Sequence, residues 1–184
     1  MIIPTNKLFV ANIQRLDIVV GMLFIEHYYK KNDYGYRLYE LSKQHDPSKF
    51  IKLIESFGEE KPRSNGIIVG FKKGYFPITE DYYLNGDGAH RLACCLHFNI
   101  KSVPVKIIEK QYKYVAHRGL KWLQDTYCEK DIERIVDFYC KLYFTESEKI
   151  KNRINYLLNN HYDDTKINNV NEYKNLIFTT NNDD

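Results

Sequence analysis

The sequence predicts an α+β fold, in which a compact core of short strands and helices is followed by an all-helical extension. Two observations support this prediction. Up to residue 110, strand-like segments alternate with helix-like segments, whereas from residue 112 onward only helical periodicity is present. Within the first part, a turn with two glycines joins a strand-like segment directly to a helix. We therefore predict a core domain over residues 1–110 and a helical extension over residues 111–184.

The first predicted elements are an extended segment and two helices. Residues 7–13 have the pattern of a first strand, and residues 16–29 have the apolar spacing of a mostly buried helix. Gly21 lies inside this helix and costs stability unless another element packs against it. A short helix is expected over residues 36–44, after a break at residues 32–35.

A third helix is predicted from its start signal. Asp46 is the expected N-cap, Pro47 occupies the first turn, and the helix runs to about residue 57. Its core side is expected to consist of Phe50, Leu53, Ile54 and Phe57. Residues 67–71 and 82–84 then have strand character, because each is a short apolar or aromatic run bounded by turn residues.

The glycine turn is followed by a helix and a strand. The helix begins at Ala89 and places Leu92, Ala93 and Leu96 on one face. The strand covers residues 102–108, which completes the α+β core.

The second half of the chain is predicted to contain three helices, over residues 112–126, 129–143 and 146–158. Residues 145–148 have the spacing of a capping box, which opens the last of these helices. Beyond residue 159 the chain is rich in Asn and Asp and has few apolar anchors. We expect this tail to dock loosely or to fray.

The composition argues against several classes of protein. A formal charge of +3 is too small and too dispersed to form a nucleic-acid footprint. The 4 cysteines and 6 histidines lack metal-ligand spacing, so we expect reduced core thiols and no structural metal. No apolar run is long enough to cross a membrane and no signal peptide is recognisable, so we expect a soluble, cytoplasmic protein.

The segment of residues 84–93 is the most informative one, because a strand, a glycine turn and a helix start converge on His90 and Arg91. A helix N-terminus presents backbone N–H groups and a partial positive charge, glycines allow a phosphate to approach it, and a guanidinium adds a fixed cation. The segment therefore favours phosphate binding. The same residues also fit a hairpin turn followed by a solvated arginine, so spacing alone leaves both interpretations open.

The run Gly-Asp-Gly-Ala-His-Arg-Leu-Ala, followed by Val103-Pro104-Val105, resembles the Gly-x-His-Arg box of the ParB N-terminal/sulfiredoxin-like superfamily. The resemblance covers residues 47–108 well and residues 1–108 more faintly. It implies a small mixed sheet with packed helices, and a turn that binds nucleotide phosphates. Sulfiredoxin binds ATP there, ParB proteins bind CTP, and free serine kinases bind ADP or ATP.

The resemblance also implies roles for individual residues. The implied phosphate-binding residues are Gly86, Asp87, Gly88, Ala89, His90 and Arg91. Asp87 lies where it could reach a magnesium-bound water or cap the helix. Sulfiredoxins carry a catalytic cysteine directly before His-Arg, and Ala89 at that position disfavours a sulfinic acid reductase. The segments after residue 112 lack an obvious recognition helix, which disfavours a chromosome-segregation ParB protein.

With these two classes disfavoured, the chain resembles the ParB-like proteins associated with surface-polysaccharide biosynthesis and the related free serine kinases. We therefore expect a transferase that uses ATP or ADP with Mg²⁺ and phosphorylates a small hydroxyl compound, such as L-serine or a related amino alcohol or sugar. His90 and Arg91 would hold the phosphate at the catalytic centre. Asp17 or Glu26 would accept the proton of the hydroxyl group.

Each of these residues also has a purely structural interpretation. Asp17 fits a first-turn acid stabilised by the helix dipole, Glu26 fits a surface partner of Lys30, and His90 fits a histidine that fixes the turn. The competing functional hypothesis is a non-catalytic nucleotide-sensing or DNA-associated ParB-like module, which predicts nucleotide binding without phosphate transfer. Under either hypothesis, the C-terminal helices are a candidate surface for a homodimer.

Overall fold

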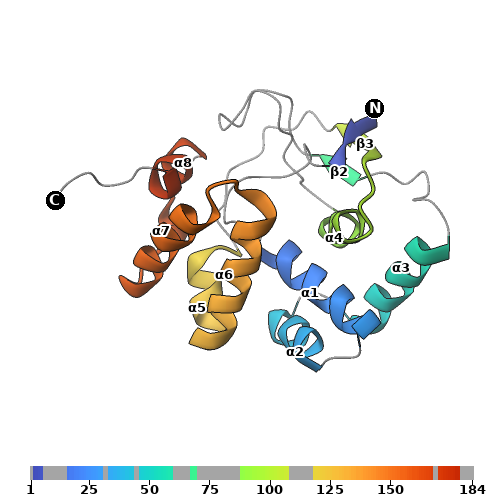
Figure 1. Cartoon of the computed structure of the whole chain (residues 1–184), viewed down its shortest axis with the longest axis horizontal. Helices are drawn as coiled ribbons and strands as arrows, with labels where there is room; N and C mark the ends of the chain where they lie inside the picture. Colours follow the sequence, from blue (N-terminus) through green and yellow to red (C-terminus); the bar gives the residue numbers. More distant parts are fainter. Residues whose placement is uncertain are drawn as a thin grey trace. The chain divides into compact units, whose positions relative to one another are not determined.

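The computed structural model describes residues 2–5, 16–30, 33–43, 46–59, 67–69, 88–107, 118–167 and 170–178. The chain divides into two compact units (Figure 1). Unit 1 comprises residues 1–10 and 17–112, and unit 2 comprises residues 11–16 and 113–184. The predicted strands at residues 7–13 and 82–84 lie outside the described residues.

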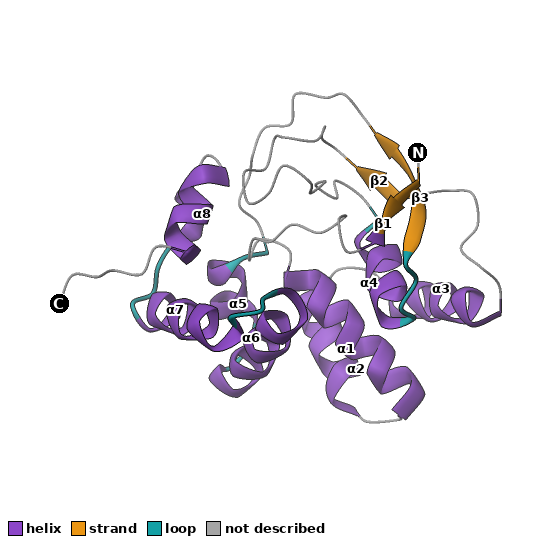
Figure 2. Ribbon diagram, turned by 45° about the horizontal axis from the view of Figure 1, so that its top comes forward, coloured by secondary structure: helices purple, strands orange, loops and turns teal. Residues whose placement is uncertain are grey.

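The predicted α+β class is wrong, because the described residues are predominantly helical. The strands β1 (Ile2–Pro4) and β2 (Ile67–Val69) have 3 residues each, and β3 (Ser102–Ile107) has 6. β3 pairs antiparallel with β1 and parallel with β2 (Figure 2). Strands this short supply few inward-facing side chains, so almost all of the buried apolar residues in the described ranges belong to helices.

The centre of unit 1 is α1 (Leu16–Lys30), which confirms the helix predicted over residues 16–29. Its apolar residues over positions 18–20 and 22–25 are all buried, with exposed fractions of 5% or less. A helix that is apolar around its whole circumference must be covered on several sides. The covering helices of the same unit are α2 (Asp33–Ser42), α3 (Pro47–Glu59) and α4 (Ala89–His97).

Two glycines allow helices to approach α1 closely. A Cβ atom on Gly21 would lie 3.2 Å from the Cβ of Ala93, so α4 is the element that packs against this glycine. A Cβ atom on Gly35 would lie only 2.1 Å from the carbonyl oxygen of Leu23. The break predicted over residues 32–35 is therefore wrong for residues 33–35, because α2 begins at Asp33 and Gly35 lies inside the helix.

The start of α3 matches the prediction. The backbone N–H of Ser48 donates to Oδ1 of Asp46 over 2.9 Å, which makes Asp46 a helix cap. Hydrogen bonds from the backbone and from the side chain of Ser48 lower the pKa of Asp46. Of the four predicted core residues of α3, Phe50 and Ile54 are buried, whereas Leu53 and Phe57 are half-buried.

In unit 2 the described helices are α5 (Leu120–Thr126), α6 (Glu129–Tyr143), α7 (Ser147–Asn159) and α8 (Val170–Phe178). The prediction for residues 129–143 is confirmed, and Tyr139 of α6 is fully buried. The predicted capping box is wrong, because Glu146 is the N-cap of α7 and its side chain makes no capping hydrogen bond. The described part of the helix predicted over residues 112–126 begins at Leu120.

The N-terminus of α5 is capped by a residue far along the chain. Its own N-cap, Gly119, has no side chain to offer. Instead, the carboxylate of Asp164, on the short 3₁₀ helix η3 (Asp164–Lys166), accepts hydrogen bonds from the backbone N–H groups of Leu120 (2.7 Å) and Lys121 (3.1 Å). Asp164 is 1% exposed, so it joins α5 to η3 in the interior of unit 2.

The C-terminal tail does not fray over residues 170–178. These residues form α8, in which Ile177 is buried and Phe178 lies 5.8 Å from the ring of Phe144. Arg153 of α7 donates from Nε to the carbonyl oxygen of Leu176 over 2.8 Å. The few apolar residues of the tail are thus sufficient to dock it when they share one helix.

Three of the four cysteines are core residues, as expected. Cys94, Cys95 and Cys140 are buried, and burial raises the pKa of Cys95 and of Cys140 to about 12. Cys128 is exposed, which corrects the prediction for this residue. Among the described residues, no helix has both the length and the apolar character needed to span a membrane.

Helices α6 and α7 are linked by an ion-pair network centred on Asp137. Lys141 donates to its Oδ2 over 2.7 Å, and Lys151 of α7 donates to its Oδ1 over 2.9 Å. The hydrogen bond from Lys141, and to a smaller extent the one from Lys151, lowers the pKa of Asp137 below its usual value of 3.8. A carboxylate with a lowered pKa contributes stability above its unfolded-state pKa and loses it as the pH falls through the folded-state pKa.

We therefore expect Asp137→Asn to destabilise the protein at pH 7 and to have a smaller effect near pH 3, which lies below the usual pKa of the carboxylate, 3.8. Because the side chain is 30% exposed, the expected loss at pH 7 is only about 0.5–1 kcal/mol. Urea unfolding at both pH values measures it. Asp125→Asn is the control, since Asp125 is 61% exposed and pairs with Lys121 of its own helix. An equal loss at both pH values would show that the effect of Asp137→Asn is not electrostatic.

Candidate functional site

The start of α4 has the backbone geometry expected of an anion-binding turn. Gly88 precedes the helix with φ 84° and ψ 29°, which is the left-handed region that favours glycine. Its carbonyl oxygen accepts the first helical hydrogen bond from the N–H of Leu92, over 2.9 Å. The first N–H groups of a helix point out of its N-terminal end, and in α4 they belong to residues 89–91. Gly88, as the N-cap, has no side chain of its own to cap this end.

His90 is held against the core of unit 1 by two aromatic residues. Its Nε2 lies 2.7 Å from the hydroxyl oxygen of Tyr39 on α2. Its ring meets Phe50 of α3 edge to face, with the ring centroids 4.6 Å apart and the planes at 79°. Tyr39 is fully buried and Phe50 is 3% exposed, so the imidazole is fixed by side chains that have little freedom themselves.

Arg91 is half-buried on the same helical turn. Successive side chains of an α-helix diverge by about 100°, so Arg91 is directed to a different side of the turn from His90. The structure thus brings together Gly88, Ala89, His90 and Arg91 of the predicted phosphate-binding set. Gly86 and Asp87 lie outside the described residues, so the proposed magnesium contact of Asp87 stays a prediction.

The two candidate bases lie toward opposite ends of α4. Gly21 of α1 packs against Ala93 of α4. Further along both helices, Tyr29 of α1 stacks on His97 of α4, with the ring centroids 5.9 Å apart. The two contacts therefore occur in the same order along α1 and α4. Asp17 precedes Gly21 by one turn, just as Ala89 precedes Ala93 by one turn. Asp17, which is 6% exposed, therefore lies toward the N-terminal end of α4.

Glu26 lies toward the other end. It accepts a hydrogen bond from Nζ of Lys30 over 2.5 Å, as its structural interpretation predicts. Burial lowers the pKa of His97 on the last turn of α4, and the charge of Glu26 opposes this shift, which places the two side chains near each other. Along the two helices, Asp17 is therefore nearer than Glu26 to the N-terminal end of α4.

The sequence analysis missed Tyr39 and Phe50 as parts of this site. Tyr39 is 51 residues away from His90 in the chain, and no spacing rule connects them. Phe50 was recognised only as a core residue of α3. The available signal is indirect: a histidine at a helix start needs a polar partner, and a buried tyrosine needs one for its hydroxyl group.

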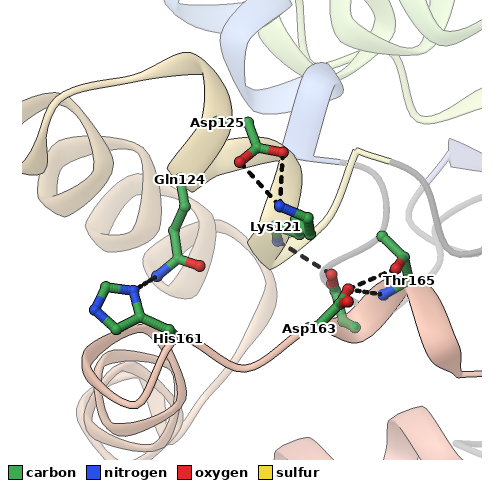
Figure 3. A network of polar contacts seen from close by, with 7 residues as sticks. Lys121, Gln124, Asp125, His161, Asp163 and Thr165 are labelled. Atoms are coloured by element: carbon green, nitrogen blue, oxygen red, sulfur yellow. Dashed lines mark hydrogen bonds and ion pairs between the residues drawn. The ribbon is translucent and has the colours of Figure 1, made fainter.

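Unit 2 contains a separate polar groove of about 990 Å³. Its wall includes an ion pair in which Lys121 donates to both carboxylate oxygens of Asp125 over 3.1 Å (Figure 3). Gln124 lies 3.5 Å from Nδ1 of His161 and donates to the carbonyl oxygen of Leu158 over 2.8 Å. Among the described residues, no group of three or more His, Cys, Asp or Glu residues could hold a metal ion.

Comparison of the chain with protein-family models, with curated proteins and with solved structures finds no match. The resemblance to the ParB N-terminal/sulfiredoxin-like superfamily therefore stays a hypothesis based on residues 86–93 and 103–105.

Proposed function

We propose that the protein is an ATP- or ADP-dependent phosphotransferase that phosphorylates a small hydroxyl compound, such as L-serine or a related amino alcohol or sugar. The observation that carries the proposal is the left-handed Gly88 directly before α4, with His90 and Arg91 on the first turn of the helix. This arrangement combines a small residue, a positive helix end and a guanidinium at one place.

Phosphoryl transfer requires little covalent help from a protein. The phosphate must be held in line with the attacking hydroxyl group, and its developing charge must be neutralised by N–H groups, arginine and Mg²⁺. Backbone N–H groups of the first turn, together with Arg91, could provide this neutralisation on the protein side. Mg²⁺ would supply the remaining positive charge, with Asp87 as its proposed contact.

A carboxylate is also needed to accept the proton of the hydroxyl group. Asp17 is favoured for this role over Glu26, because it lies toward the phosphate end of α4 and is nearly buried. Burial excludes competing water from a base. Glu26 lies near His97, toward the other end of α4.

The resemblance to free serine kinases and to ParB-like proteins of surface-polysaccharide biosynthesis supports the same class of reaction. A kinase of this kind would work in the cytoplasm, where ATP and ADP are available. A homodimer through the C-terminal helices is compatible with the proposal.

The test is ³¹P NMR of the full chain with Mg²⁺ and either ATP or ADP, in the presence of a panel of small hydroxyl compounds led by L-serine. We expect a new phosphomonoester signal, and we expect Arg91→Ala to lower its rate of formation by about 10²-fold or more. The matched control is Arg37→Ala, an arginine of unit 1 whose guanidinium packs 5.3 Å from the ring centroid of Tyr34. This control should stay within about twofold of the wild-type rate.

Two results would contradict the proposal in different ways. Binding of ATP or ADP without transfer to any compound of the panel would favour the nucleotide-sensing module instead. Transfer that is unaffected by Arg91→Ala would show that the phosphate is bound elsewhere.

A further inference from the structure

We propose that Tyr39 is a positioning residue that holds His90 in the tautomer protonated at Nδ1, so that Nδ1–H is a donor for a bound phosphate. This inference deepens the phosphate site proposed above and rests on it for its functional consequence. The state of the histidine ring itself can be measured independently of any activity.

The contact between the two side chains is specific. The hydroxyl oxygen of Tyr39 lies 2.7 Å from Nε2 of His90, which is a short distance for a hydrogen bond between oxygen and nitrogen. The rings meet at 77° with their centroids 5.7 Å apart, so the imidazole edge rather than its face is turned to the tyrosine. Phe50 packs against the imidazole edge to face and restricts its rotation.

The direction of the hydrogen bond follows from the chemistry of the two groups. A phenol hydroxyl is a stronger donor than the N–H of a neutral imidazole, and an unprotonated imidazole nitrogen is a stronger acceptor than a phenol oxygen. The favoured arrangement is therefore Tyr39 donating to Nε2. The proton of a neutral imidazole is then placed on Nδ1, because the hydrogen bond made by one ring nitrogen determines the state of the other.

Nδ1 is bonded to the ring carbon that joins the side-chain stem, so it lies closer than Nε2 to the backbone of the first turn of α4. A proton on Nδ1 therefore adds a donor beside the backbone N–H groups of residues 89–91. If Nε2 carried the proton instead, Nδ1 would present a lone pair, which repels an anion. The hydrogen bond from Tyr39 thus favours the state of His90 that supports phosphate binding.

A simple packing role for Tyr39 makes a different prediction. The residue is fully buried, and phenylalanine would fill nearly the same volume. If packing were its whole contribution, Tyr39→Phe would leave both the tautomer and the affinity for phosphate unchanged. The hydroxyl group alone is therefore the informative part to remove.

The experiment uses the full chain labelled with ¹⁵N at histidine, and long-range ¹H–¹⁵N correlation spectra at a pH where His90 is neutral. His90→Gln identifies the His90 signals among those of the 6 histidines. The expected wild-type spectrum shows the tautomer protonated at Nδ1. In Tyr39→Phe, we expect the population to shift toward the tautomer protonated at Nε2.

The same variants are tested for ATP binding by isothermal titration calorimetry. We expect Tyr39→Phe to weaken ATP binding about tenfold, which is the usual size for a lost hydrogen bond to a charged group. The matched control is Tyr139→Phe, a fully buried tyrosine of unit 2, which should change neither the His90 signals nor the affinity.

The inference is overturned if wild-type His90 is protonated at Nε2, a result that requires no variant to fold. It is also overturned if Tyr39→Phe changes neither the tautomer nor ATP affinity. If wild-type protein binds no ATP although His90 is protonated at Nδ1, the proposed nucleotide site fails while the positioning of His90 by Tyr39 stands.

Discussion

Replacing Gly35 with alanine is expected to destabilise the protein by about 3 kcal/mol or more, the upper end of the cost of overpacking. The new Cβ would lie 2.1 Å from the carbonyl oxygen of Leu23, 2.7 Å from its carbonyl carbon and 2.8 Å from the Cβ of His27. Two of these three atoms belong to the backbone of α1, which cannot move aside like the end of a flexible side chain. The helices α1 and α2 would have to separate. Urea unfolding followed by circular dichroism measures the loss.

Gly21→Ala provides a graded comparison. Its Cβ would lie 3.2 Å from the Cβ of Ala93 and 3.7 Å from a ring carbon of Phe50, and these side-chain atoms can shift by a few tenths of an ångström. We expect a loss of no more than about 1 kcal/mol, partly offset by the better helix propensity of alanine. Equal losses at the two positions would show that backbone contact is not the limiting factor in unit 1.

The second large effect is expected for Asp164→Ala, at about 2–4 kcal/mol. This carboxylate accepts hydrogen bonds from the backbone N–H groups of Leu120 and Lys121 and is 1% exposed. Removing it leaves two donors of α5 without their acceptor in a region that water does not freely enter. Thermal unfolding of the variant, compared with wild type at the same pH, measures the effect.

Two further variants define the cause of this loss. Asp164→Asn keeps one oxygen acceptor and should lose about half as much as Asp164→Ala. Asp163→Ala removes an acidic residue that caps η3 locally through the N–H of Thr165, and it should cost much less than Asp164→Ala. If Asp163→Ala were as damaging as Asp164→Ala, the long-range cap would not be the source of the stability.

Local signals in the sequence were sufficient for some features. Asp46 was recognised as a cap because its partner, Ser48, lies two residues away. The same kind of signal failed at residues 145–148. The spacing of a capping box is present there, but the helix begins at Ser147, one residue later than predicted. A spacing rule states which bonds are possible, whereas the path of the chain decides which of them form.

Gly35 shows why glycine was misread. In sequence it follows Asn32 and Asp33, and this combination is typical of a turn. In the structure it is a helical residue whose missing side chain lets α2 contact the backbone of α1. Close approach between helices depends on the tertiary arrangement, so it leaves no local mark that distinguishes it from a turn.

The fold class and the environment of His90 were not predicted correctly from the sequence, for a related reason. Short apolar runs such as residues 67–71 gave correct strand positions in part, but their number suggested a sheet core that strands of 3 to 6 residues do not build. At the candidate site, the glycine turn and the helix start were foreseen. The partner of His90 was not, because Tyr39 reaches it across 51 residues.

The distant cap of α5 also has a consequence for the order of folding. A helix of 7 residues is too short to be stable alone, and its cap is supplied by a residue 44 positions further along the chain. The closure of such a long loop costs conformational entropy before the contact can form. We therefore expect α5 to become structured late, after α6 and α7 have brought η3 into place, even though it is the first described helix of its unit to be synthesised in full.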